Sequence, residues 1–143
     1  MQNTYYSTCP EDTEKIAAEF AKSLVGGEVI AFKGGLGMGK TCFVRGLAKG
    51  LGFSGETYSP TFALMNEYIG GRLAVYHFDM YRIDGWDDLY STGFFDYRDS
   101  GGVLAVEWSE NIEGALENDT VYVTFERTGD STRTIIISRE EAN

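Results

Sequence analysis

The chain has 143 residues, of which 43% are hydrophobic and 24% are charged, and its formal net charge is −10. This length suits one domain spanning 1–143, and every apolar run is shorter than the roughly 18 residues that a membrane-spanning helix needs. The acidic balance disfavours direct binding of DNA or RNA, whose phosphates are bound largely by lysine and arginine, and suits docking onto a basic protein partner. The first residues lack the basic start and apolar core of a signal peptide, so we expect a cytoplasmic protein.

The first quarter of the chain predicts a helix, a strand and a second helix. Thr8-Cys9-Pro10-Glu11 is typical of a capping box with proline near the helix start, and an apolar stripe at helical spacing follows it. Gly26-Gly27 ends this helix. The short apolar run at 28–33 predicts a strand, and 41–49 predicts the helix after it.

The remainder predicts two hairpins separated by a helix and a buried strand. Each hairpin has alternating or apolar strands on either side of a glycine-containing turn. The expected elements are strands at 62–69 and 72–79, a segment at 86–99 that is helical at first and then irregular, a strand at 102–108, and strands at 120–125 and 133–138. We therefore expect an α/β, P-loop NTPase-like sandwich, with a mixed parallel and antiparallel central sheet flanked by helices.

The stretch GGLGMGKT at 34–41 fits the pattern G-x-x-x-x-G-K-[ST], between the predicted strand and the second helix. Such a loop folds its backbone N–H groups around a phosphate, and the next helix adds its positive N-terminal end. Lys40 can bridge the β- and γ-phosphates, and the Thr41 hydroxyl can ligate Mg²⁺. The predicted nucleotide-binding positions are Gly35, Leu36, Gly37, Met38, Gly39, Lys40 and Thr41.

Hydrolysis needs more than a phosphate loop, because the metal takes a carboxylate and a water must be oriented towards the γ-phosphate. Asp79 closes one hydrophobic strand and Glu107 nearly closes another, so both are candidates. Thr61, in the hydroxyl-rich turn Ser59-Pro60-Thr61-Phe62, is placed where a switch loop senses the γ-phosphate or its metal. His77 lies on the same strand face as Asp79, and we expect a structural histidine with its hydrogen bonds satisfied.

The order GGLGMGKT, SPTF, HFDMYR and VEW resembles the TsaE family over nearly the whole chain. The resemblance implies an ATP- and Mg²⁺-dependent P-loop ATPase of tRNA threonylcarbamoyladenosine modification, which is weak alone and works with the TsaB and TsaD subunits. It implies contact with tRNA only through that complex.

The resemblance also implies roles for individual residues. Glu107 matches a metal-site glutamate and Asp79 matches an aspartate at the nucleotide site, while Thr61 matches a switch-like threonine. Thr8 and Arg133 match segments that flank the base of the nucleotide. The sequence alone leaves two alternatives, a small P-loop kinase and a protein-binding module that nucleotide stabilises without turnover.

Overall fold

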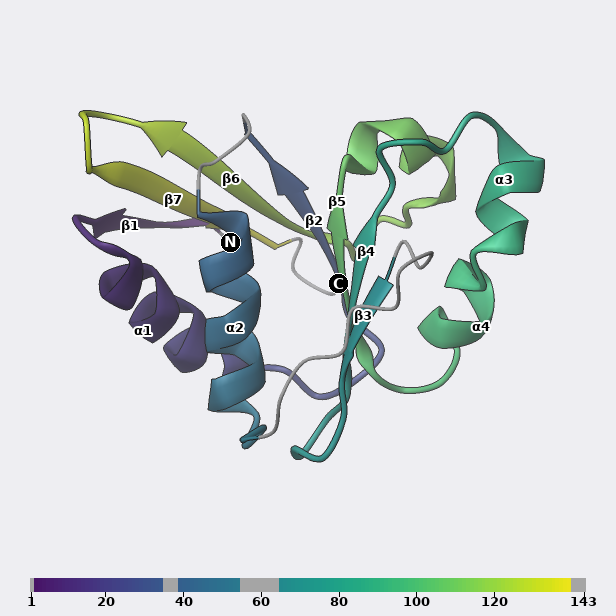
Figure 1. Cartoon of the computed structure of the whole chain (residues 1–143), viewed down its shortest axis with the longest axis horizontal. Coiled ribbons are helices and arrows are strands. Elements are labelled where there is room, and N and C mark those ends of the chain that lie inside the picture. The colour runs from purple at the N-terminus through teal and green to yellow at the C-terminus, as the bar shows by residue number, and fades with distance from the viewer. Residues whose placement is uncertain (1, 35–38, 55–64, 140–143) are drawn as a thin grey trace.

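A seven-stranded mixed sheet runs through the protein, and helices cover both of its faces (Figure 1). The computed structural model describes residues 2–34, 39–54 and 65–139. The strands are β1 (Gln2–Ser7), β2 (Val29–Lys33), β3 (Met65–Tyr68), β4 (Val75–Asp79), β5 (Val103–Glu107), β6 (Val121–Arg127) and β7 (Arg133–Ser138). The helices are α1 (Pro10–Ala21), α2 (Lys40–Gly50), α3 (Trp86–Ser91), α4 (Phe94–Arg98) and the 3-10 helix η1 (Ser109–Ala115). No helix in these ranges is long and apolar enough to cross a membrane.

The strand order is β1-β7-β6-β2-β5-β4-β3. The centre is parallel: β2 pairs with β5 and β6, and β5 also pairs with β4. The outer pairs, β3 with β4, β6 with β7 and β1 with β7, are antiparallel. The predicted mixed sheet is therefore confirmed, with parallel strands around β2 and antiparallel strands at both hairpins.

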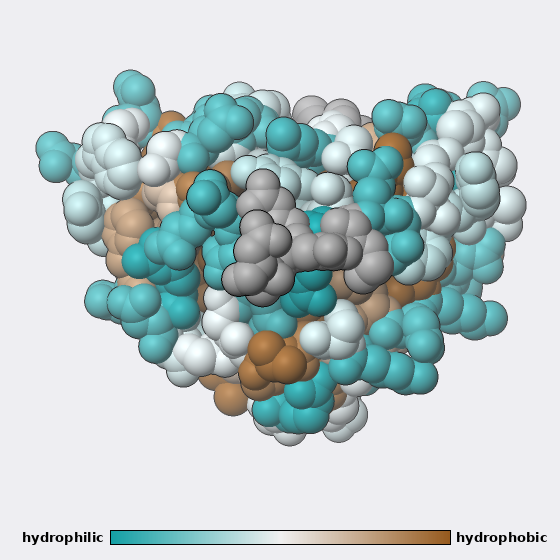
Figure 2. All heavy atoms as spheres, turned by 180° about the vertical axis from the view of Figure 1, so that it is seen from behind, coloured by the Kyte–Doolittle hydropathy of each residue, from teal (hydrophilic) through white to brown (hydrophobic). Residues whose placement is uncertain are grey.

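The sheet has a separate apolar core on each face because its central strands alternate their side chains between the two. Along β5, Val103 and Ala105 belong to the core under α1 and α2, whereas Leu104 and Val106 belong to the core under α3, α4 and η1. This burial on both faces explains why 103–106 is a continuous apolar run. The side of the molecule turned away in Figure 1 is mostly hydrophilic, with hydrophobic residues exposed in small patches (Figure 2).

Helices α1 and α2 lie side by side, and two glycines of α2 allow their backbones to approach closely. A Cβ atom at Gly46 would overlap the carbonyl oxygen of Glu14 and lie 2.8 Å from the Cβ of Ala17. One turn further on, a Cβ at Gly50 would lie 2.6 Å from the carbonyl oxygen of Ala18. Glycine is therefore required at both positions by α1, and the spacing of four residues places both on one face of α2.

The start of α1 differs in detail from the predicted capping box. The N-cap is Cys9, with no side-chain cap, and Pro10 occupies the first turn. Asp12, not Glu11, reaches back: its Oδ2 accepts hydrogen bonds from the Thr8 backbone N–H at 3.0 Å and the Thr8 hydroxyl at 2.8 Å. These bonds hold the pKa of Asp12 below its ordinary value and fix Thr8 beside the helix start.

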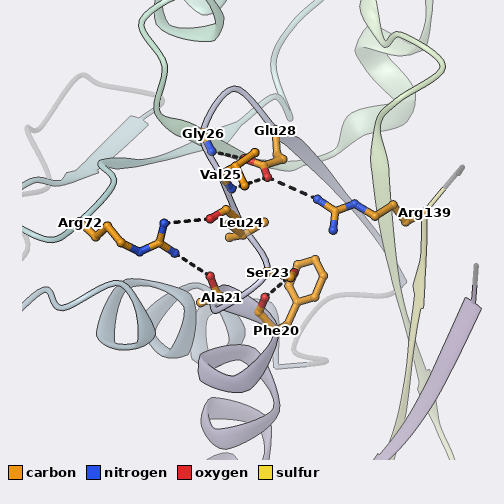
Figure 3. Close-up of polar contacts among 9 residues, drawn as sticks. All are labelled: Phe20, Ala21, Ser23, Leu24, Val25, Gly26, Glu28, Arg72 and Arg139. Carbon is orange, nitrogen blue, oxygen red and sulfur yellow. Dashed lines mark hydrogen bonds and ion pairs between the residues drawn. The ribbon is translucent and has the colours of Figure 1, made fainter. Parts of the chain in front are cut away.

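The turn between α1 and β2 is held by charged side chains from two distant parts of the chain (Figure 3). Arg72 donates to the backbone carbonyls of Leu24 at 2.9 Å and Ala21 at 3.1 Å, which lie at the end of α1. Glu28 accepts from the backbone N–H groups of Val25 and Gly26, and Arg139 pairs with it at 3.3 Å. These bonds pair backbone groups of the helix end and of the turn that follows it.

Three elements differ from the sequence-based expectation. The strand β1 was not predicted, and it adds to the sheet edge by pairing with β7. The 3-10 helix η1 was not predicted either. The segment 86–99 contains two short helices, α3 and α4, where we expected one helix followed by irregular chain.

We predict that Gly46→Ala lowers the free energy of unfolding by about 1–3 kcal/mol, because the added methyl group must push α1 away from α2. Alanine is the better helix former, so intrinsic propensity alone predicts the opposite sign. Urea unfolding followed by circular dichroism measures the change. Gly114→Ala is the matched control, since a Cβ there has its nearest contact at 3.5 Å. Equal stability of the two variants would contradict the close-approach explanation.

Candidate functional site

The candidate site lies at the carboxyl ends of the parallel strands, where ligands bind in open α/β sheets. The strand β2 ends at Lys33 and leads into the glycine stretch, and α2 begins at Lys40 on its far side. On the neighbouring strands, Asp79 ends β4 and Glu107 ends β5, and the two are register partners. The topology thus brings the start of α2 and two carboxylates to the same edge of the sheet.

The start of α2 has the features of an anion site. Its N-cap is Gly39 (φ 97°), and neither a side-chain cap nor an acidic residue occupies the first turn. The first N–H groups of this 11-residue helix are therefore not neutralised by its own side chains. Lys40 is 9% exposed, and its Nζ donates to the Gly34 carbonyl at 2.9 Å, which holds the ammonium group beside the end of β2. Thr41 follows on the exposed side of the helix.

Glu107 is linked to a buried histidine. His77 is 7% exposed, and its Nε2 lies 2.7 Å from Oε2 of Glu107. This hydrogen bond lowers the pKa of Glu107, burial opposes the shift, and the positive charge of Lys40 adds to it. The carboxylate is therefore ionised at neutral pH, so His77 donates its Nε2–H to it.

His77 was expected to have its hydrogen bonds satisfied, and only one of its ring nitrogens is. Within the described ranges the buried Nδ1 has no hydrogen-bond partner. The histidine thus fixes the orientation of one carboxylate oxygen of Glu107. Both side chains lie on the face of the sheet that α2 covers. No signal in the sequence identifies this pair, because it depends on the register between strands 30 residues apart.

Asp79 is more exposed than Glu107, and its Oδ1 accepts a hydrogen bond from the Tyr81 backbone N–H at 3.0 Å. Among the residues that the structure describes, these hydrogen bonds therefore use one oxygen atom of each of the two carboxylates. In the described part of the chain, no group of three or more His, Cys, Asp and Glu side chains can hold a metal ion by itself. A metal bound between these strands would need further ligands beyond the two acids.

A cavity of about 470 Å³ lies beside the start of α2. It is lined by three of the predicted binding residues, Thr8, Gly39 and Arg133, which come from three distant parts of the chain. Its other lining residues are Ser7, Cys9, Pro10, Thr13, Cys42 and Ser131. A hydrogen bond of 2.7 Å between the hydroxyls of Ser7 and Thr13 ties β1 to α1 at this wall. The cavity is thus continuous with the helix start that has anion-binding features.

The residue after Glu107 has an unusual backbone conformation. Trp108 has φ 58°, and no other non-glycine residue in the described ranges has a positive φ. Such a conformation costs of order 1 kcal/mol or more and persists only where the surroundings enforce it. The ring of Tyr81 packs edge-on against Trp108 at 5.0 Å, and the buried Ser109 hydroxyl donates to the Phe32 carbonyl at 3.2 Å. These contacts fix the backbone conformation of the two residues that follow Glu107.

Several predicted site residues lie outside the described residues, namely Thr61, Gly35, Leu36, Gly37 and Met38. The predicted residues that the structure brings to one edge of the sheet are Thr8, Gly39, Lys40, Thr41, Asp79, Glu107 and Arg133. Their roles in binding and catalysis stay predictions.

The fold and this edge define an α/β protein of P-loop-like architecture, and comparison with known proteins agrees. The crystal structure of Bacillus subtilis YdiB superimposes with a TM-score of 0.79 at 34% identity, covering 97% of this chain and 86% of that one. The family model described as "Threonylcarbamoyl adenosine biosynthesis protein TsaE" matches residues 7–135. The chain belongs to the TsaE family.

Two curated relatives show how far the similarity extends. Both are named tRNA threonylcarbamoyladenosine biosynthesis protein TsaE. The relative from Bacillus subtilis is 40% identical over 88% of this chain and 78% of its own length. The relative from Treponema pallidum is 36% identical over 92% of this chain and 97% of its own length. The range that the family model matches, 7–135, includes both strands that carry the acids and the cavity residues Thr8 and Arg133.

The hydrogen bond between His77 and Glu107 predicts a pH-dependent contribution to stability. The folded pKa of Glu107 lies below its ordinary value of 4.5, so the contribution is fully present above that value and is lost as the pH falls through the lowered folded pKa. We expect the difference in unfolding free energy between wild type and Glu107→Gln to be larger at about pH 6 than at about pH 3. Urea unfolding at each pH measures it.

Two controls identify the cause. Glu110→Gln removes an exposed carboxylate from the neighbouring element η1 and accounts for the general loss of one charge. In a His77→Ala background the pH-dependent part of the Glu107→Gln effect should shrink, because the largest cause of the pKa shift is gone. An unchanged effect in that background would show that the histidine does not set the pKa of Glu107.

Proposed function

We propose that the chain is an ATP-binding, slowly ATP-hydrolysing subunit that supports threonylcarbamoyl transfer to adenosine in tRNA by acting on a TsaB–TsaD complex. The observation that carries the proposal is the convergence of the uncapped start of α2, Lys40 and the register-paired Asp79 and Glu107 at one edge of the sheet. Membership of the TsaE family supports the part in tRNA modification. The family description names only threonylcarbamoyladenosine biosynthesis. The use of ATP and Mg²⁺ and the two protein partners are therefore proposed here.

The residues present fit a nucleoside triphosphate. The N–H groups at the start of α2 would face the phosphates, and the Lys40 ammonium would neutralise charge on their β- and γ-oxygens. The cavity of about 470 Å³ is large enough for a base and ribose, and Thr8 and Arg133 are among the residues that would flank the base. Because Gly39 lines the same cavity, one ligand could reach both this space and the start of α2.

The same edge of the sheet fits a magnesium ion, which takes several waters and only one or two carboxylates from protein. Thr41 and Glu107 would hold it, together with the phosphates. A bound Mg²⁺ would neutralise charge on the phosphate oxygens during transfer. His77 would keep the Glu107 carboxylate ionised and oriented, and Asp79, the register partner of Glu107, would orient the attacking water or a metal-bound water.

The acidic composition suits a subunit that acts on proteins and leaves tRNA to its partners. With a net charge of −10, the chain is poorly suited to bind a phosphate backbone directly. We therefore propose contact with tRNA only through the complex, in the cytoplasm, where tRNA is modified. Hydrolysis would be slow in the free chain and faster on the partners.

We predict that Lys40→Ala weakens both ATP binding and hydrolysis, because the phosphate charge loses its compensating ammonium group. Glu107→Ala should keep ATP binding within a fewfold of wild type but lower the hydrolysis rate by at least about a hundredfold, the usual scale for losing a charge-stabilising or water-activating group. Calorimetry measures binding, and phosphate release with Mg²⁺ measures turnover. Lys22→Ala, which removes an exposed lysine at the end of α1, is the matched control.

The outcomes separate the proposed function from its alternatives. A low basal rate that rises when TsaB and TsaD are added supports the proposal. Tight ATP binding with no turnover, either alone or with the partners, would favour a nucleotide-stabilised binding module. Normal turnover in Glu107→Ala would remove Glu107 from the site.

A further inference from the structure

Almost all of the net charge is concentrated in one part of the chain. Residues 84–119 contain ten acidic residues and one basic residue, Arg98, a net charge of −9. The rest of the chain contains twelve acidic and eleven basic residues, a net charge of −1. The segment 84–119 forms α3, α4, β5 and η1, and its helices lie on the side of the sheet opposite α1 and α2 (Figure 1). Apart from Glu107, which lies at the candidate site, these acids make the side of the molecule with α3, α4 and η1 strongly acidic.

Exposed aromatic residues lie within this acidic region. On α3, Trp86 is 53% exposed and Tyr90 is 64% exposed, and both rings pack against Phe95 of α4, at 6.4 Å and 5.0 Å. The spacing of four residues places Trp86 and Tyr90 on the same side of the helix. Large, rigid aromatic side chains that remain exposed are enriched at the centres of protein interfaces.

A hollow lies between α3 and η1, beside this aromatic cluster. Its volume is about 120 Å³, the size of one apolar side chain, and Trp86, Leu89, Ile112 and Ala115 are among the residues that line it. Both elements that border the hollow also have exposed acidic side chains. These are Asp87 and Asp88 on α3, and Glu110 and Glu113 on η1. We call this surface, defined by Trp86, Asp87, Asp88, Tyr90, Glu110 and Glu113, the α3–η1 surface.

The α3–η1 surface is connected to the candidate site by short stretches of chain. Helix α3 begins seven residues after Asp79, and η1 begins two residues after Glu107. The Asn111 side chain of η1 donates to the backbone carbonyl of Met80 at 2.9 Å. This bond joins the segment that follows Asp79 to the segment that follows Glu107. A ligand seated across α3 and η1 would therefore touch both segments that follow the candidate acids.

We propose that the α3–η1 surface is where the chain docks onto its protein partner, and that the partner presents lysine and arginine side chains around an apolar side chain that enters the hollow. The negative charge of this surface determines which kind of partner can bind to it. An RNA backbone or a second copy of this acidic surface would be repelled, whereas a basic protein surface would be attracted and steered. The inference rests on the proposed function, because it places the partner where docking can reach Asp79 and Glu107.

Binding to purified TsaB–TsaD complex from the same organism tests the inference. The double variant Asp87→Lys with Glu113→Lys and the single variant Tyr90→Ala should each bind at least about tenfold more weakly than wild type. The matched controls are Glu19→Lys with Asp130→Lys for charge, and Val25→Ala for an exposed apolar side chain, all outside 84–119. The controls should bind like wild type, and wild-type affinity should fall as salt is raised.

ATP hydrolysis by each variant without partners is the second readout, and it should equal that of wild type, since none of these residues lies at the candidate site. Unchanged partner affinity in the α3–η1 variants would overturn the inference and leave the proposed function standing. Equal weakening by the control variants would also overturn it, because net charge alone would then explain the effect. Failure of wild type to bind TsaB–TsaD would overturn the proposed partner and this surface together.

Discussion

The parallel pairing of β2 with β5, and of β5 with β4, is the constraint on which the candidate site depends. Parallel strands end at the same edge of a sheet, so the residues that close them meet there whatever their separation in the chain. The pairing of Asp79 with Glu107, and the end of β2 at the same edge of the sheet, both follow from this parallel arrangement. A shift of β4 by one residue would turn His77 and Asp79 to the opposite face and separate them from α2.

The helix that completes the site is positioned by packing more than by its own sequence. Gly46 and Gly50 bring α2 against α1, and α1 in turn starts beside Thr8 at the cavity wall. The hydrogen bonds of Arg72 and Glu28 fix the opposite end of α1 before the chain enters β2. The start of α2 is thus fixed by its close packing against α1 and by the strand β2 that precedes it, which suits the proposed role of its backbone N–H groups.

The parts of the molecule that rest on local pattern could be predicted from the sequence. The run at 28–33, the helix after the glycines and the buried strand with Glu107 near its end are local signals, and the structure confirms these elements. Features that depend on distant pairing could not be predicted in this way. The polar strand β1 gains its place only from β7, and His77 meets Glu107 only through register. The proposed capping box was wrong because Asp12 rather than Glu11 lies within reach of Thr8.

The pairing of β1 with β7 has a consequence for how the chain folds during synthesis. Gln2–Ser7 is synthesised long before its partner Arg133–Ser138, so this ladder can close only after β7 has emerged from the ribosome. Until then β1 presents unpaired backbone groups. The cavity wall that contains Ser7 and Thr8 therefore takes its final form only after β7 is available to pair with β1.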